Sequence, residues 1–185
     1  LSRLSQRGIP LAVDPKSDIA RFAGAALVKP NLGEAEQLSG LRVRGWQDVE
    51  ALMAALARRL PGSDLAVTRG GAGMVVCEAG GVPRDVPTCP REIFDVQGAG
   101  DTSIAALWLA RLAGASLYEA AIVANAAAGV VVAKIGTATV GRDELVAALP
   151  AALAAANAAA KLSTERAAPA ASDISDISDI SEKAR

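Results

Sequence analysis

The residues best suited to chemistry in this sequence form a short glycine-rich segment. Residues 95–102 read Asp-Val-Gln-Gly-Ala-Gly-Asp-Thr and precede an alanine-rich stretch of helical character. Small residues let a backbone approach a ligand closely, and the unpaired amides of a first helical turn attract anions. A carboxylate inside such an anion site, here Asp101, is useful if it accepts a proton from a hydroxyl that attacks a phosphoryl group. The segment therefore predicts phosphoryl transfer to an alcohol, although a well-capped helix start without catalytic role has the same residues.

Several other chemistries are excluded by residues that the sequence lacks. It contains no histidine, which removes the Ser-His-Asp and Cys-His hydrolases and the commonest zinc ligand. Cys77 and Cys89 are too far apart for a Cys-x-x-Cys motif. No Gly-x-x-x-x-Gly-Lys-Ser/Thr loop is present, and Ser103 stands where a Rossmann fingerprint would need glycine. Acid–base chemistry must fall to a carboxylate or a lysine.

Composition predicts a cytoplasmic protein whose partner is a small molecule. Of 185 residues 51% are hydrophobic, which is enough for one compact domain. The 19 basic residues nearly balance the 20 acidic ones, so neither nucleic acid nor a membrane surface is an expected partner. No apolar run approaches the roughly 20 residues that span a bilayer. The two cysteines fit a reducing compartment.

Short aliphatic runs alternate with helical patterns, which favours an α/β domain. Strands are predicted at residues 9–13 and 25–28, and their carboxyl ends deliver polar residues to the edge where open α/β sheets bind ligands. A helix follows at 46–60, and residues 65–77 read as strand, glycine turn and strand.

The second half of the chain is predicted to be mostly helical. Residues 93–96 read as a short strand that enters the glycine-rich segment, and a helix continues from there to about residue 113. Ser116 and Glu119 have capping-box spacing for the next helix, which is expected to end before Gly136. A last helix is predicted over about 143–161, interrupted at Pro150. We expect residues 1–162 to form the domain and residues 163–185, with their Ser-Asp-Ile repeats, a disordered tail.

Four segments resemble motifs of the ribokinase or PfkB group of carbohydrate kinases. The signature of that group resembles residues 98–101, Gly-Ala-Gly-Asp, with Asp95 three residues ahead, and its Asn-x-x-Glu motif resembles residues 31–34. Residues 68–73 are similar to its nucleotide-binding turn, and 124–128 to its helix beside the adenine. The resemblance implies a ribokinase-like three-layer sandwich with a mostly parallel central sheet, from which the N-terminal half and its lid are absent. We therefore expect a fragment or a truncated gene product.

The resemblance also implies a role for each candidate site residue. Asp101 would be the base, and Gly98, Ala99 and Gly100 would offer amides to the transferring phosphoryl group. Asn31 and Glu34 would organise Mg²⁺ and its waters, Thr68, Gly70 and Gly73 would line ATP, and Asn125 would border the adenine. Lys16 would meet a phosphate of the sugar or of ATP. Asp95, Gln97, Gly136 and Thr139 lie where relatives hold a monovalent cation such as K⁺.

For three of these residues an ordinary structural role is an open alternative. Glu34 could be an exposed helix residue, Asn125 a helix-surface asparagine and Lys16 a solvated lysine that follows a strand.

The implied function is an ATP-dependent sugar kinase. Residues 13–16, 93–96 and 125–140 look most like kinases that phosphorylate the anomeric hydroxyl of D-glycero-D-manno-heptose 7-phosphate for lipopolysaccharide core synthesis. A kinase for another sugar or nucleoside, and an inactive nucleotide-binding fragment, stay open as alternatives. The low-complexity tail favours a single-function kinase, and a homodimer is an expected assembly.

Overall fold

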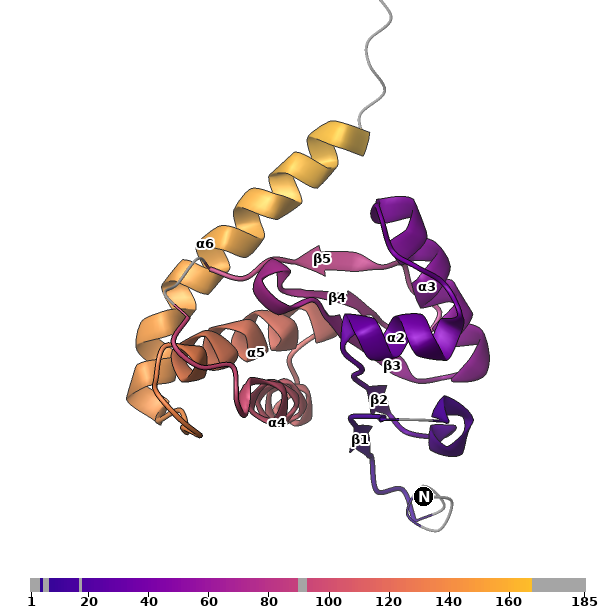
Figure 1. Cartoon of the computed structure of the whole chain (residues 1–185), viewed down its shortest axis with the longest axis horizontal. Coiled ribbons are helices and arrows are strands. Elements are labelled where there is room, and N and C mark those ends of the chain that lie inside the picture. Colours follow the sequence, from indigo (N-terminus) through magenta and orange to yellow (C-terminus); the bar gives the residue numbers. More distant parts are fainter. Residues whose placement is uncertain (1–3, 5–6, 17, 90–92, 168–185) are drawn as a thin grey trace, which may run out of the picture.

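The structure, a computed structural model, describes residue 4 and residues 7–16, 18–89 and 93–167 (Figure 1). Most of the predicted tail, residues 168–185, lies outside this part, whereas the last helix runs to Ala167, past the predicted start of the tail at residue 163.

A mixed sheet stands at the centre of the described part of the chain. Its strands, in spatial and chain order, are β1 (Ala12–Val13), β2 (Leu27–Val28), β3 (Asp64–Thr68), β4 (Met74–Cys77) and β5 (Arg84–Val86). β1, β2 and β3 pair in parallel, and β4 and β5 continue the sheet antiparallel. Parallel pairing is thus confined to the first three strands, because a tight turn rather than a crossover helix joins β3 to β4.

Helices cover both faces of this sheet, which confirms the predicted three-layer arrangement (Figure 1). On one face lie α2 (Leu32–Ser39) and α3 (Trp46–Arg59), and on the other lie α4 (Ala99–Leu112) and α5 (Leu117–Val132). The 3₁₀ turns η1 (Ile19–Phe22) and η2 (Gly70–Ala72) complete the first half, and α6 (Arg142–Ala167) packs along α5.

Each face of the sheet has its own hydrophobic core. Along β3, the alternation of side chains sends Leu65 and Val67 towards α3 and Ala66 towards α5. The α3 core contains Leu52, Met53 and Leu56, all buried at helical spacing as the sequence predicts. Burial of these two apolar layers is the main force that holds the sheet between its helices.

Several alanines are buried between α5 and α6. Ala148, Ala152 and Ala156, spaced four residues apart on α6, are at most 3% exposed. They belong to the same core cluster as Ala120 and Ala124 of α5. Small side chains on both helices allow a close approach of the two backbones.

Three sequence predictions about elements need correction. Residues 93–96 form no strand; the amides of Phe94 and Asp95 both donate to the carbonyl of Val132, which is not a ladder between strands. The predicted strands at 9–13 and 25–28 shrink to the two residues of β1 and of β2. The last helix is not interrupted, because α6 continues through Pro150 while its alanine face stays packed on α5.

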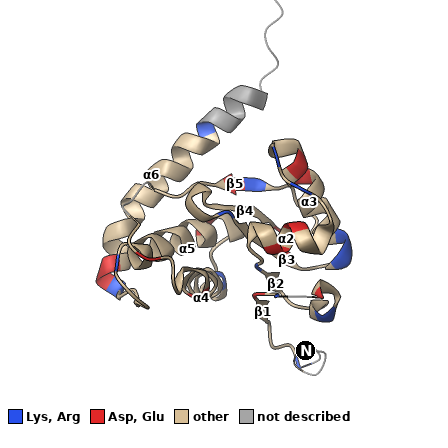
Figure 2. Ribbon diagram, viewed as in Figure 1, with Lys and Arg blue, Asp and Glu red and all other residues tan. Residues whose placement is uncertain are grey.

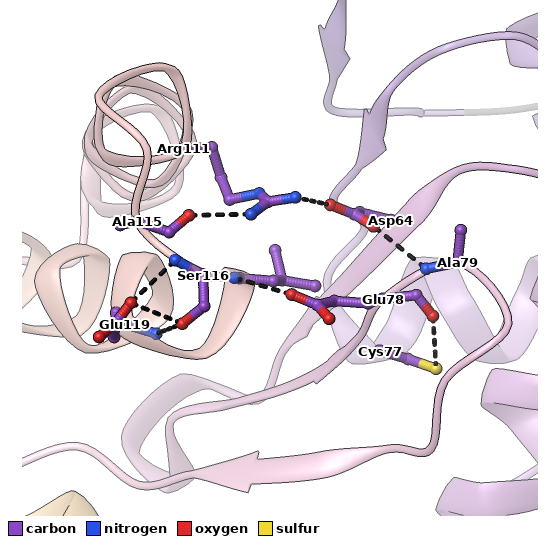
Figure 3. A network of polar contacts seen from close by, with 9 residues as sticks. Asp64, Cys77, Glu78, Ala79, Arg111, Ala115, Ser116 and Glu119 are labelled. Atoms are coloured by element: carbon purple, nitrogen blue, oxygen red, sulfur yellow. Dashed lines mark hydrogen bonds and ion pairs between the residues drawn. The ribbon is translucent and has the colours of Figure 1, made fainter.

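A polar network fixes the end of α4 against the sheet (Figure 3). Arg111 Nη2 lies 2.7 Å from Asp64 Oδ2, and Arg111 Nη1 donates to the Ala115 carbonyl at 2.8 Å. Glu78 accepts from the Leu117 amide at 3.2 Å. The predicted capping box of α5 is present, with Ser116 and Glu119 bonding to one another's backbone. These contacts join α4, α5 and β3 at one corner.

Acidic and basic residues are scattered along the described ribbon, and both signs occur in the first and the second half of the chain (Figure 2). Within the described residues, none of the helices has the length and apolar character that crossing a bilayer requires.

Candidate functional site

A cavity of about 600 Å³ opens between the sheet and the helices α4 and α5. Its wall contains seven of the residues predicted to form the site: Asn31, Thr68, Gly70, Gly73, Ala99, Gly100 and Asn125. They come from four segments that are far apart in the sequence. Gly98, Asp101, Glu34, Lys16, Asp95, Gln97, Gly136 and Thr139 lie outside this wall.

One side of the cavity is the glycine turn between β3 and β4. Gly70 and Gly73 have φ values of 57° and 87°, which glycine adopts at little cost. The Arg69 amide closes the turn by donating to the Gly73 carbonyl at 2.7 Å. A Cβ at Gly73 would collide with the backbone of Val86 and Pro87, so β5 lies directly behind the turn.

Asn125 forms part of the cavity wall and also ties α5 to the sheet. Its side chain is buried, so the alternative of a helix-surface asparagine is wrong. Nδ2 donates to the carbonyls of Val86 at 2.9 Å and Pro87 at 3.2 Å. These bonds satisfy carbonyls at the end of β5. The amide therefore has a structural task whether or not it contacts a ligand.

The start of α4 forms another part of the wall. Gly98 is the N-cap with φ 76°, and no side chain caps this helix. The Thr102 amide is the first that bonds within the helix, to the Gly98 carbonyl at 2.9 Å, and the Ala99 amide donates to Val96 at 3.3 Å. Helix geometry thus leaves the amides of Gly100 and Asp101 for a ligand, while Ala99 is already engaged.

Asp101 lies in the first turn of α4 and is exposed. Its carboxylate is thus neither deep in the protein nor part of the cavity wall formed by its neighbour Gly100. An exposed position next to the wall is where a second substrate could meet a ligand held in the cavity.

Asn31 and Glu34 form the capping box of α2. The Asn31 side chain accepts from the Glu34 amide at 2.9 Å, and Glu34 Oε2 accepts from the Asn31 amide at 2.8 Å. Glu34 is only partly exposed, so the alternative of a freely exposed helix residue is wrong. The motif has a local folding role as well as the metal role that the sequence suggests.

Lys16 joins this box to Asp14 at the end of β1. Its Nζ lies 3.1 Å from Glu34 Oε1 and 3.7 Å from Asp14 Oδ1. The bond to Glu34 and the charge of Asp14 raise the pKa of Lys16, so the ammonium stays charged. The other oxygen of Asp14 lies 3.1 Å from Nζ of Lys29, a buried lysine that the sequence interpretation missed.

The loops predicted to hold a monovalent cation lie together. Asp95 Oδ1 accepts from the Gln97 amide at 2.9 Å, and Oδ2 accepts from the Gly136 amide at 3.1 Å. The Thr139 carbonyl instead accepts from Lys134 Nζ at 2.8 Å. Across the described ranges, no group of three or more His, Cys, Asp or Glu side chains could hold a metal ion.

Several residues of the cavity wall were missed from the sequence. They include Thr88, Cys89, Ile93, Val96 and Ser103. Ser103 is 2% exposed, and its Oγ has no hydrogen-bond partner in the described structure. Its position on the helix that starts with the glycine-rich segment, one turn from Ala99, was the signal that could have identified it.

Solved structures with a similar fold include a ribokinase and a phosphofructokinase. The ribokinase of Arabidopsis thaliana, complexed with ribose and ATP, superposes with a TM-score of 0.74 at 22% identity over 80% of this chain and 50% of that one. Phosphofructokinase-2 of Escherichia coli, in complex with potassium, gives a TM-score of 0.74 at 22% identity over 82% of this chain and 50% of that one. These likenesses confirm the ribokinase-like fold.

Curated relatives are considerably closer in sequence. The bifunctional protein HldE of Halorhodospira halophila is 49% identical over 77% of this chain, which covers 30% of that protein. HldE of Pelobacter propionicus is 39% identical over 96% of this chain, which covers 35% of that protein. The chain thus spans about a third of the length of these relatives. The model of the pfkB family carbohydrate kinases matches residues 3–144, and the chain therefore belongs to this family.

Proposed function

We propose that this chain is the nucleotide-binding and catalytic part of an ATP-dependent kinase that phosphorylates an alcohol of a sugar. The observation that carries the proposal is the cavity, because its wall unites the glycine turn, Asn31, the start of α4 and Asn125. Resemblance to one family had predicted each of these segments separately.

The cavity suits a nucleotide in size and in chemistry. A volume of about 600 Å³ lies within the roughly 300–1,000 Å³ of pockets for small molecules and cofactors. Its lining is largely apolar, including Met74, Val96 and Val132, which suits a base and ribose. The amides of Gly100 and Asp101 open a helix, and a helix start attracts phosphate.

The donor set beside the cavity also fits magnesium. Glu34 and Asn31 offer carboxylate and amide oxygens, which are the ligands that this hard cation prefers. When bound through its waters, Mg²⁺ would supply positive charge to the nucleotide phosphates. K⁺ near Asp95, Gln97, Gly136 and Thr139 remains part of the proposal, although Lys134 takes the Thr139 carbonyl.

In this mechanism the chain positions the two reactants and accepts the proton of the attacking hydroxyl. The cavity would hold ATP with its γ-phosphoryl group at the start of α4, where main-chain amides stabilise the negative charge that develops during transfer. Asp101 would orient the attacking hydroxyl and accept its proton as the new oxygen–phosphorus bond forms, while the bond from the γ-phosphorus to its bridging oxygen breaks and ADP leaves.

The finer proposal concerns the acceptor. We infer that it is the anomeric hydroxyl of D-glycero-D-manno-heptose 7-phosphate, because residues 13–16, 93–96 and 125–140 resemble kinases of this sugar. Lys16, exposed at the carboxyl edge of the sheet, is a candidate contact for a phosphate.

The test uses the full-length protein that carries this chain, with ATP, Mg²⁺ and one candidate acceptor at a time. We expect ADP release with heptose 7-phosphate, and a new C1 phosphate in the ³¹P spectrum of the product. Release of ADP only with ribose, fructose 6-phosphate or a nucleoside would contradict the proposed substrate but support the proposed kinase activity. Nucleotide binding without any transfer would instead indicate an inactive module.

A further inference from the structure

Both carboxylate oxygens of Glu34 already have partners. Oε2 accepts from the Asn31 amide at 2.8 Å, and Oε1 lies 3.1 Å from the ammonium of Lys16. The first contact caps α2 and is part of the helix. The second joins side chains from separate segments. Any cation that approaches Glu34 must therefore compete with Lys16 for Oε1.

Lys16 is the most exposed member of this cluster. Its side chain is 75% exposed, whereas that of Glu34 is 15% exposed. It has a second carboxylate within reach, because Asp14 Oδ1 lies 3.7 Å from Nζ. Lys16 can therefore leave Glu34 and keep an acidic partner.

Asp14, the second carboxylate within reach of Lys16, is held in place by an ion pair with Lys29. Its Oδ2 lies 3.1 Å from Nζ of Lys29, whose side chain is 2% exposed. A buried ammonium must keep its counter-ion, since an unpaired charge there is costly. Asp14 is thus a fixed acceptor at the end of β1, with Oδ1 directed to no other hydrogen-bond partner in the described structure.

We propose that Lys16 is the resting counter-ion of Glu34, and that Mg²⁺ displaces it from Oε1 while Asp14 retains the released ammonium at the carboxyl edge of the sheet. The inference rests on the proposed function, because it concerns the metal of that reaction. Two cations beside one oxygen repel each other, and a divalent ion with its bound waters attracts a carboxylate more strongly than a singly charged ammonium does at a similar distance. The bond from Asn31 to Oε2 can persist throughout, so α2 stays capped.

If Mg²⁺ takes the place of Lys16 at Glu34 Oε1, the affinity of the protein for Mg²⁺ should rise when Lys16 is removed. A lysine that merely contacts phosphate has little effect on Mg²⁺ affinity without nucleotide. A lysine that occupies the metal's oxygen weakens that affinity. Removal of Lys16 should then strengthen Mg²⁺ binding.

The experiment is calorimetric titration of Mg²⁺ alone into the full-length protein and its Lys16→Met and Lys16→Arg variants. An exposed ion pair of this kind corresponds to a change of about two- to fivefold in Kd. We expect Lys16→Met to lower the Kd for Mg²⁺ by that factor and Lys16→Arg to stay near wild type. The matched control is Arg42→Met, which removes an exposed cation from Glu36 of the same helix and should leave the Kd unchanged.

An unchanged or higher Kd in Lys16→Met would overturn the exchange, as would an absence of Mg²⁺ binding in both wild type and variant. Failure of the kinase proposal shows in a different measurement, the release of ADP. A protein that transfers no phosphoryl group could still show the shift in Kd, so the two outcomes are distinguishable.

Discussion

Arg111 Nη2 lies 2.7 Å from Asp64 Oδ2 and so connects the last turn of α4 to the first residue of β3 (Figure 3). The other end of α4 is the glycine-rich start that borders the cavity. A helix held at its far end keeps a defined direction, and the position of its first turn follows from that direction. The pair therefore lies at a distance from the proposed chemistry but on the element that carries it.

We expect Arg111→Met to lower the free energy of unfolding by about 1–3 kcal/mol, because Asp64 and the Ala115 carbonyl lose a partly buried partner. Urea denaturation measures the change. Arg42→Met removes an arginine whose side chain is 81% exposed and should change stability by less than about 1 kcal/mol. Equal losses in the two variants would contradict a special role for Arg111.

Gly73→Ala should disrupt the turn between β3 and β4. The residue has φ 87°, and an added Cβ would meet the backbone of β5 and Pro87. We expect a loss of at least about 1 kcal/mol in stability, measured by thermal unfolding. Gly71→Ala, two residues earlier, has nothing within 4 Å of its new Cβ and serves as control. A similar melting temperature for Gly73→Ala and wild type would show that the turn adapts.

The two cysteines should differ in their reaction with iodoacetamide. Cys89 belongs to the cavity wall, whereas Cys77 is 8% exposed and burial raises its pKa. A raised pKa leaves less thiolate, so Cys77 should react slowly throughout. We expect ATP to slow the alkylation of Cys89, which peptide mass spectrometry can follow over time. Labelling of Cys89 at the same rate with and without saturating ATP would place the nucleotide elsewhere.

Asp101→Asn should abolish most of the phosphoryl transfer without weakening the binding of ATP. We expect kcat of the full-length enzyme to fall by at least about a hundredfold, because the amide cannot accept the proton of the acceptor hydroxyl. Affinity for ATP, from titration calorimetry, should stay within a few-fold of wild type.

Asp143→Asn is the matched control, since Asp143 is also an exposed carboxylate in the first turn of a helix. It should keep full turnover. If Asp101→Asn also turns over within a few-fold of wild type, Asp101 is not the base.

Much of the fold could be predicted because its signals are local. The apolar spacing of α3, the Ser116–Glu119 cap and the glycines between β3 and β4 each determine structure within a few residues. Seven residues of the cavity wall were predicted, and they were predicted by motif rather than by geometry. Their meeting in one cavity depends on the order of the strands, which no single motif encodes.

The errors came from contacts between distant segments. The stretch 93–96 has the apolar residues of a strand, yet no strand of the described residues pairs with it. The amides of Phe94 and Asp95 donate to the carbonyl of Val132 in α5 instead. Pro150 is unfavourable in an isolated helix, but packing on α5 outweighs the missing bond. The ion pair between Lys29 and Asp14 joins the ends of two strands, so it could not be predicted from the sequence of either segment alone.

Three alanines of α6, Ala148, Ala152 and Ala156, are buried in the core that α6 shares with α5, and this limits how these positions can change. A seam of alanines has almost no bulk to lose, so truncation, the usual way to weaken a core, hardly applies to it. Added volume is the real hazard, because each extra carbon must push two backbones apart. We therefore expect Ala148, Ala152 and Ala156 to tolerate substitution only by glycine or serine, whereas the exposed positions of α6 should tolerate many residue types.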